Sequence, residues 1–478
     1  MPGFAGLRTD FATWAIMSAM TLCWLASLRL VPNWKRDGWT ALLKSVYGLV
    51  WLDFGVDIVL RFGMLAYNAV EWGNGTPRLV AQSVEVVNTT LFYCGLFWLV
   101  VVLAYAVASP RQSAGPLTVA RGITPDFAYQ AALPVSALAT MAFYLAETGK
   151  LPLVLITPVS LLACLYMVPA AIVWWDHFRR PGPKWRIGGI HLIVLMPALV
   201  HGIISPYREN LAALFLIPLI AALFAGRRPR LRTVVPLGLV CLLLLSVVVQ
   251  SYRRIKWENV RPDEVASEIQ QDGLTGWLSL ASGEPVHRFH GFDSFLLTVA
   301  LVPTLEPHSG RHVLTSALLR GVVPRAVYNG KSGAMAGINF GSRIWAYDDP
   351  VVREGGGASI APSMPGDLYD AGGVLYIVFG ALIWGVLLGL VDGWKSHLPP
   401  FAAATVVVLV MTQCAMSVER DFDNSIATFI QTLLVFVIVA GVVALARQDQ
   451  ARYSHRLLRG LHHARGWRDE VGPSLERS

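Results

Sequence analysis

The sequence has few cysteines and few charged residues. Its five cysteines all lie inside apolar runs, with no CxxC pair and no metal-ligand spacing, so neither a disulfide framework nor a zinc site is predicted. A membrane thiol transpeptidase is excluded for the same reason, because its cysteine would have to lie at the aqueous rim. Only 15% of the 478 residues are charged, whereas 54% are hydrophobic. This composition predicts a polytopic membrane protein.

The sequence also lacks a glycine-rich phosphate loop and a Rossmann-like soluble segment, so no nucleotide-binding domain is predicted. A net charge of +8 would suit a nucleic-acid partner, but the basic residues are dispersed between apolar runs instead of gathered on one soluble face. We therefore expect membrane lipids, and no nucleic acid, as partners.

Apolar runs of roughly 16 to 25 residues predict an all-α fold with about eleven transmembrane helices. The seventh run is short enough to leave its assignment open. The predicted spans cover residues 11–31, 40–62, 86–107, 127–145, 153–175, 187–204, 211–225, 234–249, 374–391, 401–416 and 426–446.

Basic residues are concentrated in alternate connections between the runs, about 21 on one side against about 5 on the other. The positive-inside rule then predicts an outer N-terminus and a cytoplasmic C-terminus. Four regions follow from this topology. They are an N-terminal bundle of about eight helices (1–250), an extracytoplasmic loop with re-entrant or interfacial helices (251–372), about three C-terminal helices (373–446) and a basic cytoplasmic tail (447–478).

The outer loop places cations beside apolar stretches. A guanidinium group binds phosphate oxygens in a bidentate manner and keeps its charge when partly desolvated, so these side chains suit an anionic, lipid-linked ligand such as a polyprenyl pyrophosphate. The alternative is that they extend to lipid head groups or pair with acids of the same loop. The residues concerned are Arg253, Arg288, Arg320, Arg325, Lys331 and Arg343.

Two other polar groups stand out against the apolar background. The short outer connection around Arg420 contains Asp421 and Asp423, whose DxD spacing could bind a divalent metal. An ion-pair network with the loop arginines is the favoured interpretation. In the second span, Asp57 and Arg61 share one helix face with Asp53, where they would line a cavity or form an ion pair within the bundle.

The order of motifs in the outer loop resembles that of the oligosaccharide repeat unit polymerases, the O-antigen polymerases of the Wzy type. Those proteins commonly carry a "PR..W..KP" run, followed by "P...GE.Y..FG..G" before a helix. Here Tyr328 stands in place of the tryptophan and Asp367 in place of the glutamate. The matching segments are RFHGFDSF (288–295), VP (302–303), GVVPRAVYNGK (321–331) and PSMPGDLYDAGG (362–373).

This resemblance implies a multi-pass enzyme of the bacterial cytoplasmic (inner) membrane with a GT-C-like fold. Such an enzyme transfers a glycan from undecaprenyl pyrophosphate to another lipid-linked oligosaccharide repeat unit on the outer face. The reaction is an inverting displacement that needs no metal and no cofactor, because the pyrophosphate carrier is already a good leaving group. A chain-length regulator and a flippase are the protein partners that the resemblance implies.

The chemistry of this reaction assigns expected roles. Asp367 or Asp293 would orient or deprotonate the acceptor hydroxyl. Tyr369 would hydrogen-bond the sugar, and Asp370 would cap the helix that follows. Cations would stabilise the departing pyrophosphate, with Arg325 as the catalytic member and the others as binding residues: Arg253, Arg288, Arg320, Lys331, Arg343 and Arg420.

The glycine- and proline-rich stretch 355–373 would break the backbone outside the ninth span and form the floor of the acceptor site. The alternative is that this stretch only caps the helix. Two other functions remain open. An O-antigen ligase shares the carrier and the leaving group but differs in its acceptor, and a lipid-linked glycan transporter or flippase would use the intramembrane charges near Asp57.

Overall fold

The computed structural model describes residues 10–67, 83–109, 125–147, 165–180, 188–204, 208–240, 291–323, 363–414 and 421–438, together with residues 159, 162, 343, 344 and 441 and scattered positions between 251 and 273. Every regular element within these residues is a helix, which confirms the all-α prediction. Three helices are long and apolar enough to cross a membrane: Phe11–Leu30, Val84–Ala108 and Met364–Lys395. The membrane character is therefore supported, whereas the count of eleven spans stays a prediction.

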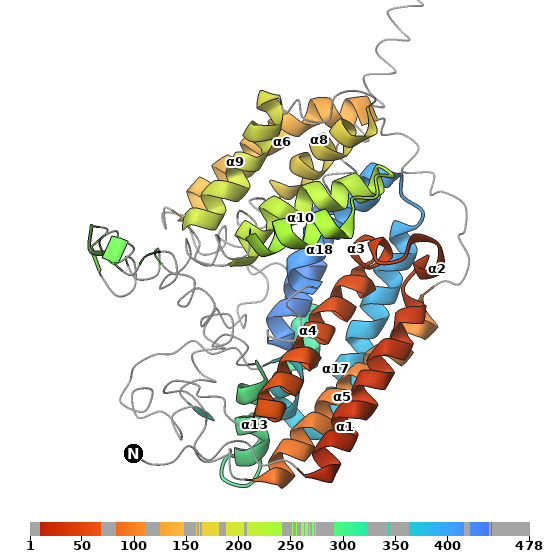
Figure 1. The fold of residues 1–478 in the computed structure, drawn as a ribbon, viewed down its shortest axis with the longest axis vertical. Helices are drawn as coiled ribbons and strands as arrows, with labels where there is room; N and C mark the ends of the chain where they lie inside the picture. The colour runs from red at the N-terminus through yellow and green to blue at the C-terminus, as the bar shows by residue number, and fades with distance from the viewer. Residues whose placement is uncertain are drawn as a thin grey trace, which may run out of the picture.

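One bundle contains α1 (Phe11–Ser27), α4 (Val46–Tyr67), α5 (Val84–Ala108) and α17 (Met364–Lys395), which run side by side in Figure 1. Its core is rich in stacked aromatic rings. Short elements connect and flank it: η1 (Leu28–Leu30), α2 (Trp34–Asp37), α3 (Thr40–Lys44), α13 (Gly291–Leu301) and α14 (Val313–Val322).

A second group of helices packs on the first through α18 (Pro400–Cys414), which contacts α4 as well as α8 and α10. The predicted spans 127–145, 187–204, 211–225 and 401–416 agree with the observed helices to within a few residues, because each apolar run ends at polar or helix-breaking residues, whereas the predicted span 153–175 begins well before α8. The group comprises α6 (Pro125–Glu147), α8 (Met167–Arg179), α9 (Gly189–Ile204) and α10 (Arg208–Phe224), and two further helices are Leu231–Val240 and Phe422–Ile438.

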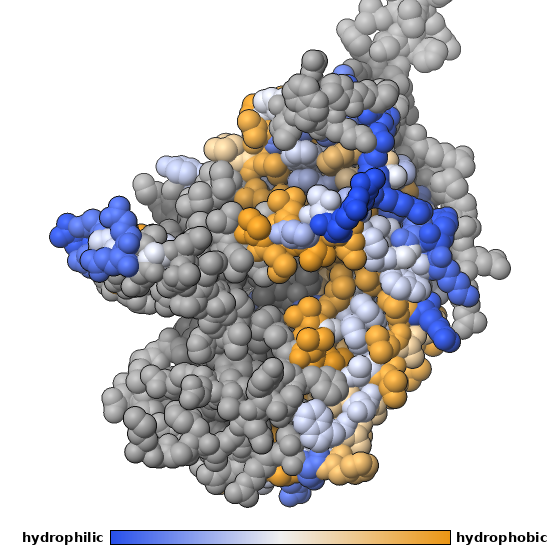
Figure 2. Space-filling view, in the orientation of Figure 1, coloured by the Kyte–Doolittle hydropathy of each residue, from blue (hydrophilic) through white to orange (hydrophobic). Residues whose placement is uncertain are grey.

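The outer faces of the bundle are apolar, as Figure 2 shows along the long helices. Phe92 and Leu103 on α5 are 56% and 57% exposed, and Leu375 on α17 is 69% exposed. Large apolar side chains exposed along whole helices would be unfavourable in water but are favourable against lipid tails. These faces suit contact with the bilayer.

Glycines on α17 allow its backbone to approach α5 closely. A Cβ atom on Gly385 would collide with the carbonyl oxygen of Val101 and would lie 2.7 Å from Cβ of Ala104. A Cβ atom on Gly389 would lie 2.8 Å from Cβ of Ala108. Small residues at such positions are the usual means by which membrane helices pack tightly, because lipid supplies little hydrophobic drive between helices.

Replacing Gly385 by alanine is therefore expected to destabilise the protein by about 1–3 kcal/mol, the usual cost of overpacking. Thermal unfolding in detergent measures the change. Gly189→Ala is the matched control, because nothing lies within 4 Å of a Cβ atom built on Gly189 in α9. Equal melting temperatures for the two variants would contradict the close contact between α17 and α5.

The far end of α17 is fixed by a buried carboxylate. Asp392 accepts hydrogen bonds from the hydroxyls of Ser45 (2.6 Å) and Tyr105 (3.1 Å) and from the backbone N–H of Val46 (2.9 Å), at the first turn of α4. Lys395 completes the set with an ion pair of 2.7 Å. These bonds satisfy the free N–H groups of the α4 N-terminus and hold α4 and α5 to α17.

Candidate functional site

The N-terminal part of α17 is a separate helical segment. Ser363 caps it by accepting a hydrogen bond from the backbone N–H of Gly366 at 3.2 Å. The helix breaks at Gly372 and Gly373, where φ of Gly373 is +73°, a value that favours glycine. Residues 364–371 are thus helical instead of an irregular floor, and 355–362 lie outside the described residues. Asp370 was predicted to cap the helix after the break, but its carboxylate instead forms ion pairs with Arg311 and Arg343.

The break in α17 frees backbone carbonyl groups, and the loop between α13 and α14 satisfies them. His308 Nδ1 lies 2.9 Å from the carbonyl oxygen of Tyr369. Ser309 donates to the carbonyl oxygen of Asp370 from its backbone N–H at 2.8 Å and from its hydroxyl at 3.2 Å. This loop therefore docks on the broken end of the helix, which brings its next cation, Arg311, to the acids of the segment.

Asp367 is the centre of the resulting polar cluster. Its side chain is fully buried and forms an ion pair with Arg311. Its second oxygen accepts hydrogen bonds from the backbone N–H groups of Phe422 (3.0 Å) and Asp423 (3.4 Å). Asp367 thus caps the helix Phe422–Ile438 from another part of the chain, which joins that helix to α17.

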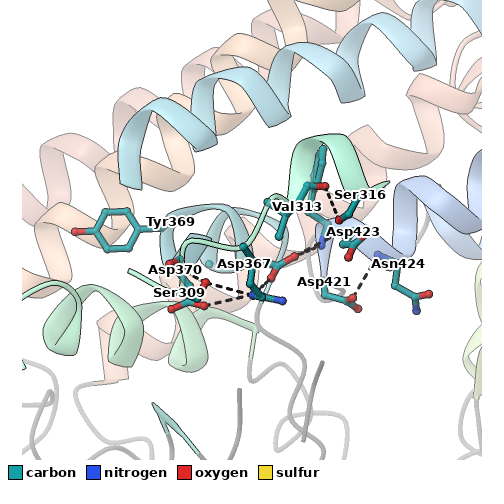
Figure 3. A network of polar contacts seen from close by, with 12 residues as sticks. Ser309, Val313, Ser316, Asp367, Tyr369, Asp370, Asp421, Asp423 and Asn424 are labelled. Atoms are coloured by element: carbon teal, nitrogen blue, oxygen red, sulfur yellow. Dashed lines mark hydrogen bonds and ion pairs between the residues drawn. The ribbon is translucent and has the colours of Figure 1, made fainter. Parts of the chain in front are cut away.

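Asp370 lies one helical turn after Asp367 and faces the same side, as Figure 3 shows. Arg311 reaches it at 3.3 Å, so one guanidinium group bridges both carboxylates. Arg343 forms a second ion pair with Asp370. The side chains of Arg311 and Arg343 are 35% and 27% exposed, whereas the two carboxylates are almost completely buried. The arginines therefore form the accessible surface of the cluster.

A second ion pair lies on the neighbouring elements. Arg320 of α14 binds Asp423 at 2.6 Å, and both side chains are nearly buried. Ser316, on the same α14, donates a hydrogen bond to the carbonyl oxygen of Val313 at 3.4 Å (Figure 3). This pair agrees with the predicted ion pairing for Asp423, whereas residues 418–420 of the same connection lie outside the described residues.

Asp421 differs from the other three aspartates. Among the described residues, no cation forms an ion pair with it, and the backbone N–H of Asn424 donates to it at 3.3 Å. Burial and the nearby negative charges of Asp367 and Asp423 raise the pKa of Asp421 to about 6. A carboxylate with a pKa near neutrality can accept a proton more readily than an ordinary aspartate, which suits a general base.

Of the residues predicted to act on the glycan or the pyrophosphate, the structure describes the side chains of four. Asp367, Arg320 and Arg343 converge in the cluster. Tyr369 comes from the same helical segment but points away (Figure 3), and its hydroxyl donates to the carbonyl of Val302 at 3.3 Å. Its contact with sugar stays a prediction. Asp293 lies in α13, but its side chain is outside the described residues, as are Arg253, Arg288, Arg325, Lys331 and Arg420.

Sequence reasoning missed the central cation, Arg311, and did not single out Asp421 as a base. A signal for Arg311 was present: Asp367 and Asp370 share one helix face in an apolar setting, which requires a nearby cation. The sequence does not indicate which cation fills that role, because Arg311 lies 56 positions from Asp367. Among the described residues, no group of three His, Cys, Asp or Glu side chains could hold a metal ion.

Comparison with known protein families finds a match in the middle of the chain. Residues 183–394 are similar to a family described as a domain of unknown function, DUF8712. No curated protein and no solved structure matches the chain. The matched segment includes Arg311, Arg320 and Asp367 and ends before Asp421. The cluster is thus shared between the region similar to DUF8712 and the C-terminal helices.

Proposed function

We propose that the chain is a membrane glycosyltransferase of the polysaccharide polymerase type. It transfers a glycan from undecaprenyl pyrophosphate to a lipid-linked oligosaccharide repeat unit on the outer face of a bacterial inner membrane. The resemblance of the outer loop to O-antigen polymerases motivates the proposal. The observation that carries it is the cluster at the broken end of α17, where Asp421, a carboxylate of raised pKa, lies near Asp367, which is paired with the partly exposed Arg311.

In such a transfer the acceptor hydroxyl needs a base and the leaving pyrophosphate needs cations, and the cluster contains both kinds of group. In the transfer, the acceptor hydroxyl attacks the anomeric carbon of the donor and its proton passes to Asp421. The bond from that carbon to the pyrophosphate oxygen breaks, and the pyrophosphate leaves with the electron pair. The exposed edges of Arg311 and Arg343 are suited to bind the negative charge of the leaving group.

In this proposal Asp367 is a positioning residue. Its carboxylate is fully buried and occupied by Arg311 and by two backbone N–H groups, so it orients the arginine and the helix that carries Asp421. Arg320 holds Asp423 next to the base in the same manner. The segment 364–371 then supports the site instead of lining it, which refines the expectation drawn from the sequence.

Incubation of the purified protein with a single lipid-linked repeat unit tests the function. We expect a ladder of longer lipid-linked products, without added metal or nucleotide. Transfer to a lipid A core acceptor without a ladder would indicate a ligase instead. Movement of the intact donor across a proteoliposome membrane without any new glycosidic bond would indicate a transporter.

A further inference from the structure

A second polar cluster lies at the opposite end of the bundle, around Asp37 at the end of α2. Three cations meet the single carboxylate: Arg36 at 3.1 Å, Lys44 at 3.2 Å and Arg228 at 3.4 Å. The Asp37 side chain is 6% exposed, whereas Arg36 and Arg228 are 72% and 64% exposed. We call Arg36, Lys44 and Arg228 the basic triad. Their charges exceed that of Asp37 by two.

The basic triad lies where apolar helices end. It joins α2 and α3, which connect α1 to α4, with the residues that follow the end of α10 at Phe224. Figure 2 shows a hydrophilic area over the region of α2 and α3 that borders the apolar surface of the helices. Trp34 and Trp39 flank Asp37 in sequence, and tryptophan is enriched at the level of lipid head groups. The triad is therefore positioned at a membrane–water boundary.

The carboxylate itself stays charged at neutral pH. Burial alone would raise the pKa of Asp37, but hydrogen bonds and the charges of Arg36 and Lys44 outweigh this effect and lower it. The buried carboxylate therefore serves to gather the three cations while their outer edges face the boundary. A phosphodiester could bind these edges, because guanidinium groups bind phosphate oxygens in pairs.

We propose that the basic triad is a binding site for the head group of an anionic phospholipid, such as phosphatidylglycerol. This inference does not depend on the proposed transferase activity, since the triad and the Asp421 cluster lie at opposite ends of α17 and α4. The phosphodiester occupies the edges of Arg36 and Arg228, Lys44 supports it from the buried side, and the acyl chains lie along the apolar helices.

Native mass spectrometry tests this site on the full-length protein in detergent with added phosphatidylglycerol or phosphatidylcholine. We expect phosphatidylglycerol adducts to be retained preferentially, and Arg36→Gln/Arg228→Gln to weaken retention roughly tenfold or more. The matched control is Lys35→Gln/Arg230→Gln, which removes the same charge next to the triad from residues that do not bind Asp37. Equal losses in both variants would overturn the site.

A variant with the opposite expected sign covers the case in which the double variant does not fold. Asp37→Asn keeps a side-chain oxygen that can accept hydrogen bonds from the gathered cations but removes the competing negative charge, so phosphatidylglycerol retention should increase. Unchanged or reduced retention would contradict the proposal. Inorganic phosphate provides a further arm: if it displaces the lipid at equal concentration, the triad recognises a free phosphate and the lipid assignment is wrong.

Discussion

Asp421→Asn is expected to lower the rate of glycan transfer by about 10²–10⁴-fold, the usual contribution of a general base. Asparagine has the same shape but cannot accept the proton of the acceptor hydroxyl at neutral pH. The variant should nevertheless fold, because an asparagine oxygen can accept the hydrogen bond from the N–H of Asn424 and keep the first turn of the helix Phe422–Ile438 intact. The ladder assay and thermal unfolding measure the two effects separately.

The pH dependence of the wild-type reaction gives a second measure of the same role. A base must be deprotonated, so activity should rise as the pH increases through about 6, the raised pKa of Asp421. Because the folded protein retains a proton that an unfolded chain releases near pH 3.8, the contribution of Asp421 to stability is full below pH 3.8 and is lost as the pH rises to about 6. Activity should therefore increase while this contribution decreases.

The residual activity of Asp421→Asn should show no rise near pH 6. Asn424→Ala is the matched control, since it keeps the carboxylate and the backbone N–H but alters the neighbouring side chain. A variant that lacks the Asp421 carboxylate and still polymerises at the wild-type rate would exclude Asp421 as the base. Asp293, the other acid predicted from the sequence, would then be the next residue to test.

Arg311→Ala is expected to destabilise the folded protein by about 3 kcal/mol. The substitution leaves the Asp367 carboxylate buried without its cation and also removes a partner of Asp370. The estimate is at the lower end of the range for buried ion pairs because the Arg311 side chain is 35% exposed and water screens part of the interaction. Thermal or denaturant unfolding in detergent measures the loss.

A double-mutant cycle identifies the cause of that loss. Asp367→Asn keeps an oxygen for the N–H of Phe422 but removes the buried charge, so Arg311→Ala should cost much less in this background. Arg261→Ala is the surface control. Its ion pair with Asp263 is 73% and 64% exposed, and its removal should change stability by about 0.5 kcal/mol or less. Additive effects of Arg311→Ala and Asp367→Asn would show that the pair does not stabilise the fold.

The helices could be predicted from the sequence because hydropathy is a local property. The free energy of moving an apolar run from water into a membrane depends mainly on the residues within the run. The apolar run 86–107 therefore predicted the position of α5 (Val84–Ala108) closely. The predicted span 374–391 matches the part of α17 after the break at Gly372 and Gly373, but the helical segment 364–371 before the break was not predicted, because it contains Asp367 and Asp370. These charges lower the hydropathy of a segment whose acids are in fact neutralised by ion pairs.

The sequence by itself therefore determined the helical class, the membrane character and the residue types of a site that combines arginines with carboxylates. Only the tertiary structure decided that Arg311 binds Asp367, that Arg320 binds Asp423, and that Asp421 is left with a raised pKa. The physical reason is that an ion pair depends on distance and burial in space. Both are set by the packing of α14, α17 and the helix Phe422–Ile438, which are far apart along the chain.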